Sequence, residues 1–163
     1  MAFRSITAAF FLIAAAVAPA QPPAAPRLDA RAAQAIVAGC ARHSSGRGQS
    51  HAIAVVDAGG RMVAALRMDG NSYGIMDFAL AKAQASAAWR SPTAGMAQGA
   101  RETPGFGSAP HVAIVAGGVP VFSPDGQEML GAVGVSGEAP ADDAACAEAG
   151  IAAAGLRSRR APG

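Results

Sequence analysis

The chain has 163 residues, which is enough for one domain with a modest core. Hydrophobic residues make up 52% of it, charged residues make up 15%, and the formal net charge is +2. A charge this small argues against a nucleic-acid partner, because such proteins normally carry a dense basic patch. Lys82 is the only lysine in the chain, so its surroundings are of particular interest.

The first twenty residues have the pattern of an export signal. Arg4 precedes a short apolar run over residues 8–17, and an Ala-Pro-Ala sequence then ends at Ala20. The run is about ten residues long, whereas a membrane-spanning helix needs about twenty. We therefore expect a signal peptide over residues 1–20, a periplasmic or secreted protein, and no stable membrane span after cleavage. An uncleaved N-terminal anchor is the alternative.

The next segments predict a leader and a helix. Residues 21–27 are rich in proline and should form an extended leader. Apolar residues then recur at helical spacing over residues 28–43, and Asp29 is placed to cap the start of this helix. A stretch of glycine and serine at residues 44–50 ends it.

A β-hairpin is predicted next. Its first strand covers residues 52–56, and the sequence Asp-Ala-Gly-Gly at residues 57–60 supplies the positive φ angles that a tight turn requires. Apolar residues alternate with other positions along the second strand, at residues 61–68. This alternation predicts a sheet with one covered face and one partly polar face.

A second helix is predicted over residues 73–90, where Asn71 and Ser72 precede it and Pro92 ends it. Two different faces of this helix could pack on the sheet. One is a stripe with Lys82 at its centre, formed with Ile75, Phe78, Ala85 and Trp89. The other is the alanine-rich side, formed by Ala79, Ala83 and Ala87.

The following segments predict a loop and three short strands. Residues 93–110 are rich in glycine and proline, and we expect them to form a long irregular loop. Loops of this length are typically either functional or disordered. The strands are expected at residues 112–115, 119–122 and 129–135.

The last predicted element is a helix over residues 142–156, with Asp142 or Asp143 at its start. Because hairpins dominate the element order, the predicted fold class is α+β, a two-layer sandwich of a mainly antiparallel sheet with helices packed on it. We expect the domain to cover residues 28–156 and to be followed by a flexible tail over residues 157–163.

Five short segments carry a family pattern when they are taken in order. They are IAVVDAGG, LRMDG, LAKAQASAAWRSPT, GGVPVF and LGAVGVSG, at residues 53–60, 66–70, 80–93, 117–122 and 130–137. Together with the acidic start of the last helix, they resemble the GlcG/HbpS-type haem-binding family over nearly all of the chain after the leader. The resemblance implies a profilin-like sandwich that assembles into homo-oligomers, and haem as the ligand of some members. A related domain is fused to enzymes of cobalamin metabolism, and other members are associated with glycolate utilisation.

Haem binding would most naturally use histidine. His43 ends the first helix and His51 begins the first strand, positions that equally suit solvent-exposed side chains. His111 follows the long loop and opens a predicted strand, where ligands often bind, so we predict it as the metal ligand. Further candidates are Tyr73, Met68 and Met62, although methionines on an alternating strand usually belong to the core.

Lys82 needs a partner if it lies in an apolar stripe, because burying an unpaired charge is costly. We expect that partner to be Asp57 or Asp69 from the hairpin turns, or a carboxylate of a ligand such as a haem propionate. The alternatives are structural, either a side chain that reaches solvent or an ion pair that holds the helix to the sheet. Arg67 and Arg90 are similar candidates for binding anionic groups, with an exposed surface role as the alternative.

Export changes the interpretation of the two cysteines. In an oxidising compartment a disulfide between Cys40 and Cys146 would tie the first helix to the last, and it would contribute about 2–4 kcal/mol. Two buried free thiols are the alternative. The chain has no CxxC sequence, so a thioredoxin-type redox role has no support.

The first functional hypothesis is an exported haem-binding protein that acts in binding or sensing and not in catalysis. The sequence contains no GxSxG, HExxH or phosphate-binding loop pattern that would indicate an enzyme. The alternatives are an oligomeric accessory module that binds an organic acid or a corrinoid, and a weak haem-degrading enzyme.

Overall fold

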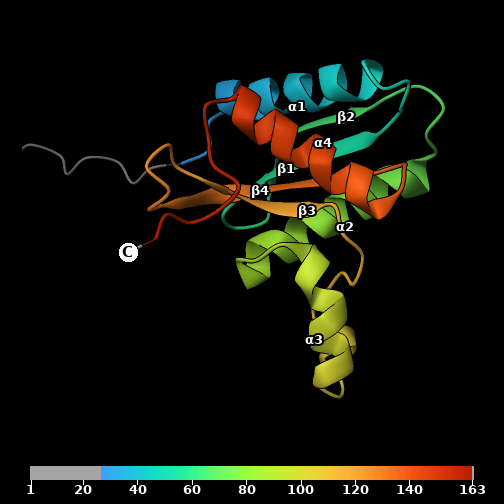
Figure 1. Ribbon diagram of the computed structural model, residues 1–163, viewed down its shortest axis with the longest axis vertical. Helices are drawn as coiled ribbons and strands as arrows, with labels where there is room; N and C mark the ends of the chain where they lie inside the picture. The colour runs from blue at the N-terminus through green and yellow to red at the C-terminus, as the bar shows by residue number, and fades with distance from the viewer. Residues whose placement is uncertain (1–26, 163) are drawn as a thin grey trace, which may run out of the picture.

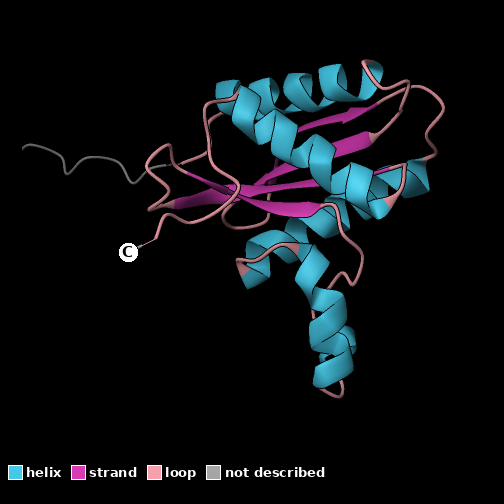
Figure 2. Cartoon of the chain, viewed as in Figure 1, coloured by secondary structure: helices cyan, strands magenta, loops and turns pink. Residues whose placement is uncertain are grey.

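The computed structural model of the protein describes residues 27–162. The elements in chain order are α1 (Ala30–Ser45), β1 (Ala52–Asp57), β2 (Met62–Arg67), α2 (Tyr73–Trp89), η1 (Thr93–Gly95), α3 (Met96–Glu102), η2 (Phe106–Ser108), β3 (Gly118–Phe122), β4 (Met129–Ser136) and α4 (Pro140–Ala153) (Figures 1 and 2). The predicted signal peptide and nearly all of the predicted leader lie outside the described residues. Within residues 27–162, none of the helices has the length and apolar character needed to cross a membrane.

The four strands form one antiparallel sheet in the order β2-β1-β4-β3. Helices α1 and α4 cover one face of this sheet and α2 lies on the other (Figure 1). The predicted α+β class, with helices packed on a mainly antiparallel sheet, is confirmed. Because helices cover both faces, the sandwich has three layers in cross-section.

The prediction of one partly polar sheet face is wrong for the central strands. Every residue of β4 is buried, and so is every residue of β1 except Asp57. Only the edge strand β2 is open to solvent, with Met62 50% exposed and Leu66 38% exposed. The prediction rested on the alternation in β2 alone. Because β2 is an edge strand, its exposure does not indicate the burial of the central strands.

The two faces of the sheet bury different kinds of core. Between the sheet and α1/α4, the core contains branched side chains such as Ile36, Ile53, Val121, Val133 and Ile151. Between the sheet and α2, it consists almost entirely of alanine: Ala52, Ala54, Ala79, Ala83, Ala87 and Ala132, together with Val56. The alanine-rich side of α2 is therefore the packed face, and the alternative stripe points partly to solvent.

Small side chains allow α2 to approach the sheet very closely. A Cβ atom built at Gly134 in β4 would overlap the carbonyl oxygen of Ala79 and the amide nitrogen of Ala83. The backbone of the helix therefore lies directly against the backbone of the strand. Only glycine leaves enough room at this position.

The prediction of a strand at residues 112–115 is wrong, because this segment is irregular in the structure. His111, which precedes it, has a φ angle of 56°, which is a turn conformation and not an extended one. The segment connects the α3 region to β3 and pairs with no strand within the described residues.

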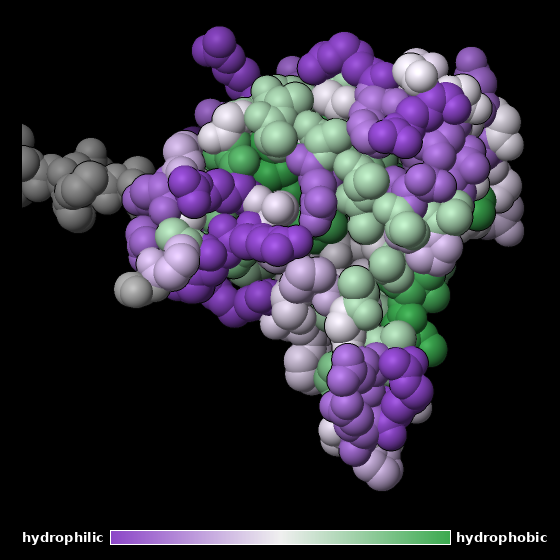
Figure 3. All heavy atoms as spheres, in the orientation of Figure 1, coloured by the Kyte–Doolittle hydropathy of each residue, from purple (hydrophilic) through white to green (hydrophobic). Residues whose placement is uncertain are grey.

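The prediction of a long irregular loop at residues 93–110 is also wrong. The segment forms η1, α3 and η2 and projects from the body as an arm with a hydrophilic tip (Figures 1 and 3). Phe106 folds back on Gly99, where an added Cβ would lie 3.1 Å from its ring, and it contacts Trp89 edge to face at 5.0 Å. These aromatic contacts order a segment whose glycines and prolines alone predict a loop.

The helix starts agree only partly with the sequence. Asp29 caps α1 as predicted, since its Oδ1 accepts a hydrogen bond of 2.7 Å from the amide of Ala32. Helix α4 begins at Pro140, two residues before the predicted start. Asp143, predicted to lie at the start of this helix, turns its side chain into the core.

Cys40 and Cys146 form a disulfide in the structure, with their Cα atoms 4.7 Å apart. It links α1 to α4, which pack closely along glycine residues. A Cβ built at Gly150 would lie 2.5 Å from the carbonyl oxygen of Ile36. The bond therefore joins two helices that already touch through their backbones.

The C-terminal segment hydrogen-bonds to the turn between β3 and β4. The backbones of Arg157 and Phe122 exchange two hydrogen bonds, 2.7 and 3.1 Å long, and the amide of Ala161 donates to Gly126 at 3.0 Å. The sequence predicts a flexible tail from residue 157 onward, because it has no periodic pattern there. These backbone bonds to a distant turn are what place the segment.

Substituting Gly134 by alanine tests the close contact between α2 and β4. Because the added methyl group would overlap backbone atoms of the helix, we expect the free energy of unfolding to fall by about 1–3 kcal/mol. Urea denaturation followed by circular dichroism measures this change. Gly74→Ala in α2 is the control, since the nearest atom to a Cβ there is 3.9 Å away, and it should retain full stability. A Gly134→Ala protein as stable as the wild type would contradict this packing.

Candidate functional site

Four polar side chains are buried together where the end of β4 meets the start of α4. They are Ser44 of α1, His51 just before β1, Lys82 of α2 and Asp143 of α4, and none is more than 1% exposed. We call these four residues the buried polar chain. Because burying unpaired polar groups is costly, each of them needs a partner inside the protein.

Lys82 finds its partners at this end of the sheet. Its Nζ lies 2.8 Å from Asp143 Oδ2 and donates a second hydrogen bond of 2.9 Å to the carbonyl oxygen of Val135. The same ammonium group lies 4.7 Å from the ring centroid of Phe78. The ion pair therefore joins α2 on one face of the sheet to α4 on the other.

Gly117 provides the space for this ion pair. A Cβ atom at this position would lie 2.9 Å from Lys82 Nζ and 3.0 Å from Asp143 Cβ, and the φ angle of the residue is 122°. Both the lack of room for a Cβ atom and the positive φ angle require glycine at this position. The turn just before β3 thus leaves a gap through which the two faces of the sheet are connected.

The predicted partners of Lys82, Asp57 and Asp69, are wrong. Val135 pairs with Ile53 near the start of β1, whereas Asp57 is at the other end of the strand. Asp57 instead accepts hydrogen bonds of 2.9 Å from the amides of Gly59 and Arg61, so it serves its own turn as predicted. Asp69 is exposed in the turn after β2.

His51 is fully buried, so the prediction of a solvated edge residue is wrong, and so is the prediction of a haem ligand at this position. Its Nδ1 lies 2.7 Å from Ser44 Oγ, and its Nε2 lies 3.4 Å from Asp143 Oδ1. The residue follows a polar loop in the sequence, which suggested exposure. Burial follows from the contact between α1 and α4, which the local sequence does not reveal.

The order serine, histidine, aspartate is reminiscent of a hydrolase triad, but the geometry argues for a structural role. Ser44 Oγ is enclosed, 3.1 Å from Cys146 Sγ, so no substrate can reach it. Ser44 Oγ carries one hydrogen and has two possible acceptors for it, the carbonyl oxygen of Cys40 at 3.0 Å and Nδ1 of His51, while Nε2 of His51 makes no hydrogen bond. The sequence showed no sign of this arrangement, since its three members come from three separate parts of the chain.

The charge states of the buried polar chain follow from its burial. Burial lowers the pKa of His51 below its ordinary value of 6.5, and the nearby carboxylate of Asp143 only partly opposes this shift. Burial raises the pKa of Asp143, and the hydrogen bond and charge of Lys82 act against the rise. A neutral His51 beside the Lys82–Asp143 ion pair leaves no net charge in the core.

His111 has the opposite environment. It is exposed, and it lines a cleft of about 180 Å³ together with the hairpin turn at residues 58–60 and with Gln84 and Ala88 of α2. The guanidinium of Arg61 borders the same turn, since a Cβ at Gly59 would lie 2.8 Å from its Nη1. The structure thus brings an open imidazole and a cation to the same glycine turn. Sequence reasoning did not single out Arg61.

The remaining predicted site residues are scattered. Tyr73 is 82% exposed at the start of α2, and Arg67 is exposed on the edge strand, where its guanidinium donates to the carbonyl oxygen of Asn71. Met68 Sδ accepts from the amide of His51 at 3.5 Å, while Met62 is half exposed. These residues do not converge on one cavity.

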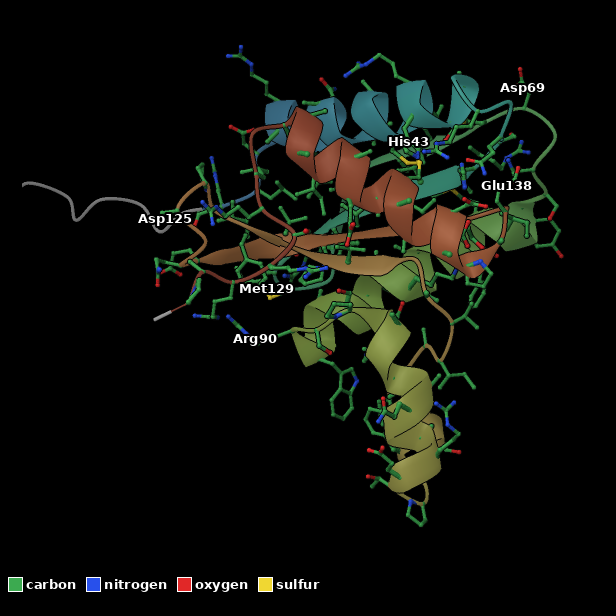
Figure 4. The ribbon with its side chains drawn as sticks, in the orientation of Figure 1. His43, Asp69, Arg90, Asp125, Met129 and Glu138 are labelled. Carbon is green, nitrogen blue, oxygen red and sulfur yellow. A yellow bond between two sulfur atoms is a disulfide. The ribbon has the colours of Figure 1, made fainter. Side chains whose placement is uncertain are left out.

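Figure 4 shows that the other two candidates are also separated. His43 lies on the α1 side of the sheet, and Arg90 lies on the opposite side, below the strands. Among residues 27–162 no group of three or more histidine, cysteine, aspartate or glutamate side chains is arranged to hold a metal ion. The structure therefore leaves His111 as the open imidazole and the buried polar chain as part of the core.

Comparison with known proteins now identifies the family. The model of a family described as "Haem degrading protein HbpS-like" matches residues 28–152. The chain belongs to this HbpS-like family. No curated protein matches the chain.

Solved structures agree with membership of the HbpS-like family. A double mutant of HbpS from Streptomyces reticuli is 28% identical with a TM-score of 0.73, and the match covers 85% of this chain and 97% of that one. A chain from the crystal structure of a PduOC complex with haem is 20% identical to this chain, with a TM-score of 0.76, and the match covers 83% of this chain and 100% of that one. ORFY from Klebsiella pneumoniae is 23% identical with a TM-score of 0.74, covering 86% and 97%. The last two similarities show the fold.

Replacing Lys82 by methionine tests the ion pair. The substitution would leave Asp143 buried without its cation, so we expect the free energy of unfolding to fall by about 3–5 kcal/mol. The double variant Lys82→Met/Asp143→Leu removes both charges and should be clearly more stable than the single variant. Chemical denaturation of the three proteins measures both effects. A double variant as unstable as the single one would show that the charges are not coupled.

The lowered pKa of His51 predicts a pH dependence of stability. Below about pH 6.5 the unfolded chain binds a proton that the folded protein resists, so the contribution of this group to stability is lost as the pH falls. We expect the wild type to lose more stability between about pH 7.5 and pH 5.5 than His51→Gln does.

The raised pKa of Asp143 acts in the opposite direction, because the folded protein takes up that proton first as the pH falls. The test is therefore the difference in the pH dependence of stability between the wild type and His51→Gln. Equal pH dependence in the wild type and in His51→Gln would refute the lowered pKa.

Proposed function

We propose that this protein is an exported haem-binding protein of the HbpS-like family that acts by binding and not by catalysis, with His111 as the ligand of the haem iron. The observation that carries the proposal is the exposure of His111. Of the three histidines of the chain, all of which the structure describes, His51 is buried and His43 is half-buried. Neutral imidazole is a common axial ligand of haem iron.

The surroundings of His111 suit a flat ligand. The turn at residues 58–60 carries no side chain larger than a methyl group, so a planar molecule can approach its backbone. Ala88 adds a small apolar wall, and Gln84 adds an amide. The Arg61 guanidinium beside this turn is placed to pair with a carboxylate such as a haem propionate.

The size of the cleft suggests that one chain does not enclose the ligand. Its volume of about 180 Å³ lies below the roughly 300–1,000 Å³ of enclosed small-molecule pockets. One chain would therefore leave a haem held by His111 partly uncovered. A second copy of the chain covering the remainder would account for the oligomers that the family resemblance implies, and we include a homo-oligomer in the proposal.

The comparisons support this proposal at the level of the family. The matching family is described as haem degrading, and the PduOC domain that shares the fold is described in complex with haem. When bound, haem would supply a redox-active iron. The part that we assign to this chain is to hold that iron through His111 and to hold an acidic group through Arg61.

Hemin titration of the purified protein tests the proposal. We expect a Soret shift that saturates near one haem per chain at low micromolar concentration. His111→Ala should weaken binding at least tenfold or change the Soret position, because the iron loses its imidazole. His43→Ala is the matched control and should bind as the wild type does. No Soret shift in the wild type would refute haem binding, and an unchanged His111→Ala spectrum would refute the assigned ligand.

Haem degradation is a second candidate, which the description of the matching family favours. The Ser44–His51–Asp143 arrangement does not serve it, because all three side chains are buried. Incubating the haem-loaded protein with a reductant and oxygen separates the candidates. A defined open tetrapyrrole with released iron would establish degradation, whereas intact haem or bleaching without a defined product supports binding alone.

A further inference from the structure

A hollow near the C-terminal end of α2 shares no lining residue with the His111 cleft. It has a volume of about 500 Å³ and lies between η1, β3 and α4, with residues 158–160 of the C-terminal segment as one wall. Three arginines line it, Arg90, Arg159 and Arg160, while Glu148 is the one acidic residue among its lining residues. The hollow therefore carries an excess of positive charge.

The arginine side chains have no acidic partner. Within residues 27–162, the only ion pairs shorter than 4.0 Å are those of the buried polar chain, so none involves these arginines. Arg160 lies over the ring of Phe122, with 5.5 Å between its Cζ and the ring centroid. A guanidinium that rests on an aromatic ring keeps its donors free for an anion.

Backbone hydrogen bonds hold Arg159 and Arg160, which we call the arginine wall, in place. Hydrogen bonds at Arg157 and Ala161, on either side of the wall, tie it to Phe122 and to Gly126. The guanidinium of Arg157 also donates to the carbonyl oxygen of Pro124 at 2.8 Å. The guanidinium of Arg160 donates one hydrogen bond, from Nη1 to the carbonyl oxygen of Gln127 at 3.3 Å, so its other N–H groups and the guanidinium of Arg159 are available to a ligand.

The rest of the lining is apolar and continues into a second hollow. Pro92, Ala94, Val119 and Pro120 line the arginine side. A neighbouring hollow of about 450 Å³ shares residues 91, 92 and 94 and extends along the arm to Met96 and Phe106. Figure 3 shows hydrophilic side chains around the C-terminal segment next to apolar surface on the same face. A cationic end thus leads into an apolar trough.

We propose that this pair of hollows binds an amphipathic monocarboxylate, with its carboxylate on Arg159 and Arg160 and its apolar chain directed along the trough toward Phe106. The site is separate from His111. Its arginine wall follows residue 152, where the match to the HbpS-like family ends, so it is a feature of this chain beyond the matched region. Because neither hollow contains a histidine, cysteine or tyrosine in its lining, the chemistry points to an organic anion and not to bound iron.

Decanoate is a suitable probe, and Trp89 is a natural reporter. Trp89 is the only tryptophan of the chain, and it contacts Phe106 at the far end of the trough. We expect decanoate to change the Trp89 fluorescence with saturation and to raise the melting temperature. The uncharged 1-decanol should bind at least tenfold more weakly, and inorganic phosphate should leave the fluorescence unchanged.

Two double variants of equal charge complete the test. Arg159→Gln/Arg160→Gln should weaken decanoate binding at least tenfold, whereas Arg31→Gln/Arg47→Gln, at exposed positions outside the hollows, should not. Circular dichroism confirms that each variant is folded. Equal binding of decanol and decanoate, equal loss in both double variants, or no saturable response to decanoate would overturn the proposal. His111→Ala should bind decanoate normally, so this result is independent of the result with hemin.

Discussion

The ion pair between Lys82 and Asp143 connects the two faces of the sheet. It requires α2 to lie so close to the strands that an ammonium group can reach the far side. Alanines on the helix and Gly134 in β4 permit that approach, and Gly117 leaves the gap through which the side chain passes. Val135 and Asp143 then satisfy the ammonium group, which makes the burial of this single lysine energetically acceptable.

The residues of this ion pair and its neighbours are enclosed in the core, whereas other polar groups lie at the surface. The polar residues that resemble a catalytic arrangement contact one another inside the protein and are closed to substrates. The groups that remain open lie along α2 and its continuation, with His111 and Arg61 at the hairpin turn and the arginine wall beside η1. The side of α2 that packs on the sheet therefore stabilises the fold, and the surfaces beside the helix stay open to solvent.

Local patterns in the sequence predicted much of the fold. Periodicity, caps and glycine turns identified α1, the hairpin and α2, and the ordered motifs identified the family. The exceptions depended on contacts between distant residues. His51 is buried by α1 and α4, the arm is ordered by Trp89 and Phe106, and residues 157–161 are placed by the turn between β3 and β4.

The candidate site was less predictable than the fold for the same reason. The sequence identified Lys82 as unusual but assigned its partner to the nearest turns, whereas Asp143 reaches it from the last helix. It identified His111 but not the neighbouring Arg61, because their proximity depends on how the arm returns to the hairpin. Residue type indicates what a side chain can do, and the topology decides which side chains meet.

In our proposal the buried polar chain is structural and haem binds at the surface on His111. Nuclear magnetic resonance of histidine-labelled protein during addition of ferric hemin tests it most directly, because paramagnetic iron broadens the signals of nearby nuclei. The His111 signals should broaden and disappear while those of His51 stay unchanged. Loss of the His51 signals with retention of the His111 signals would contradict it.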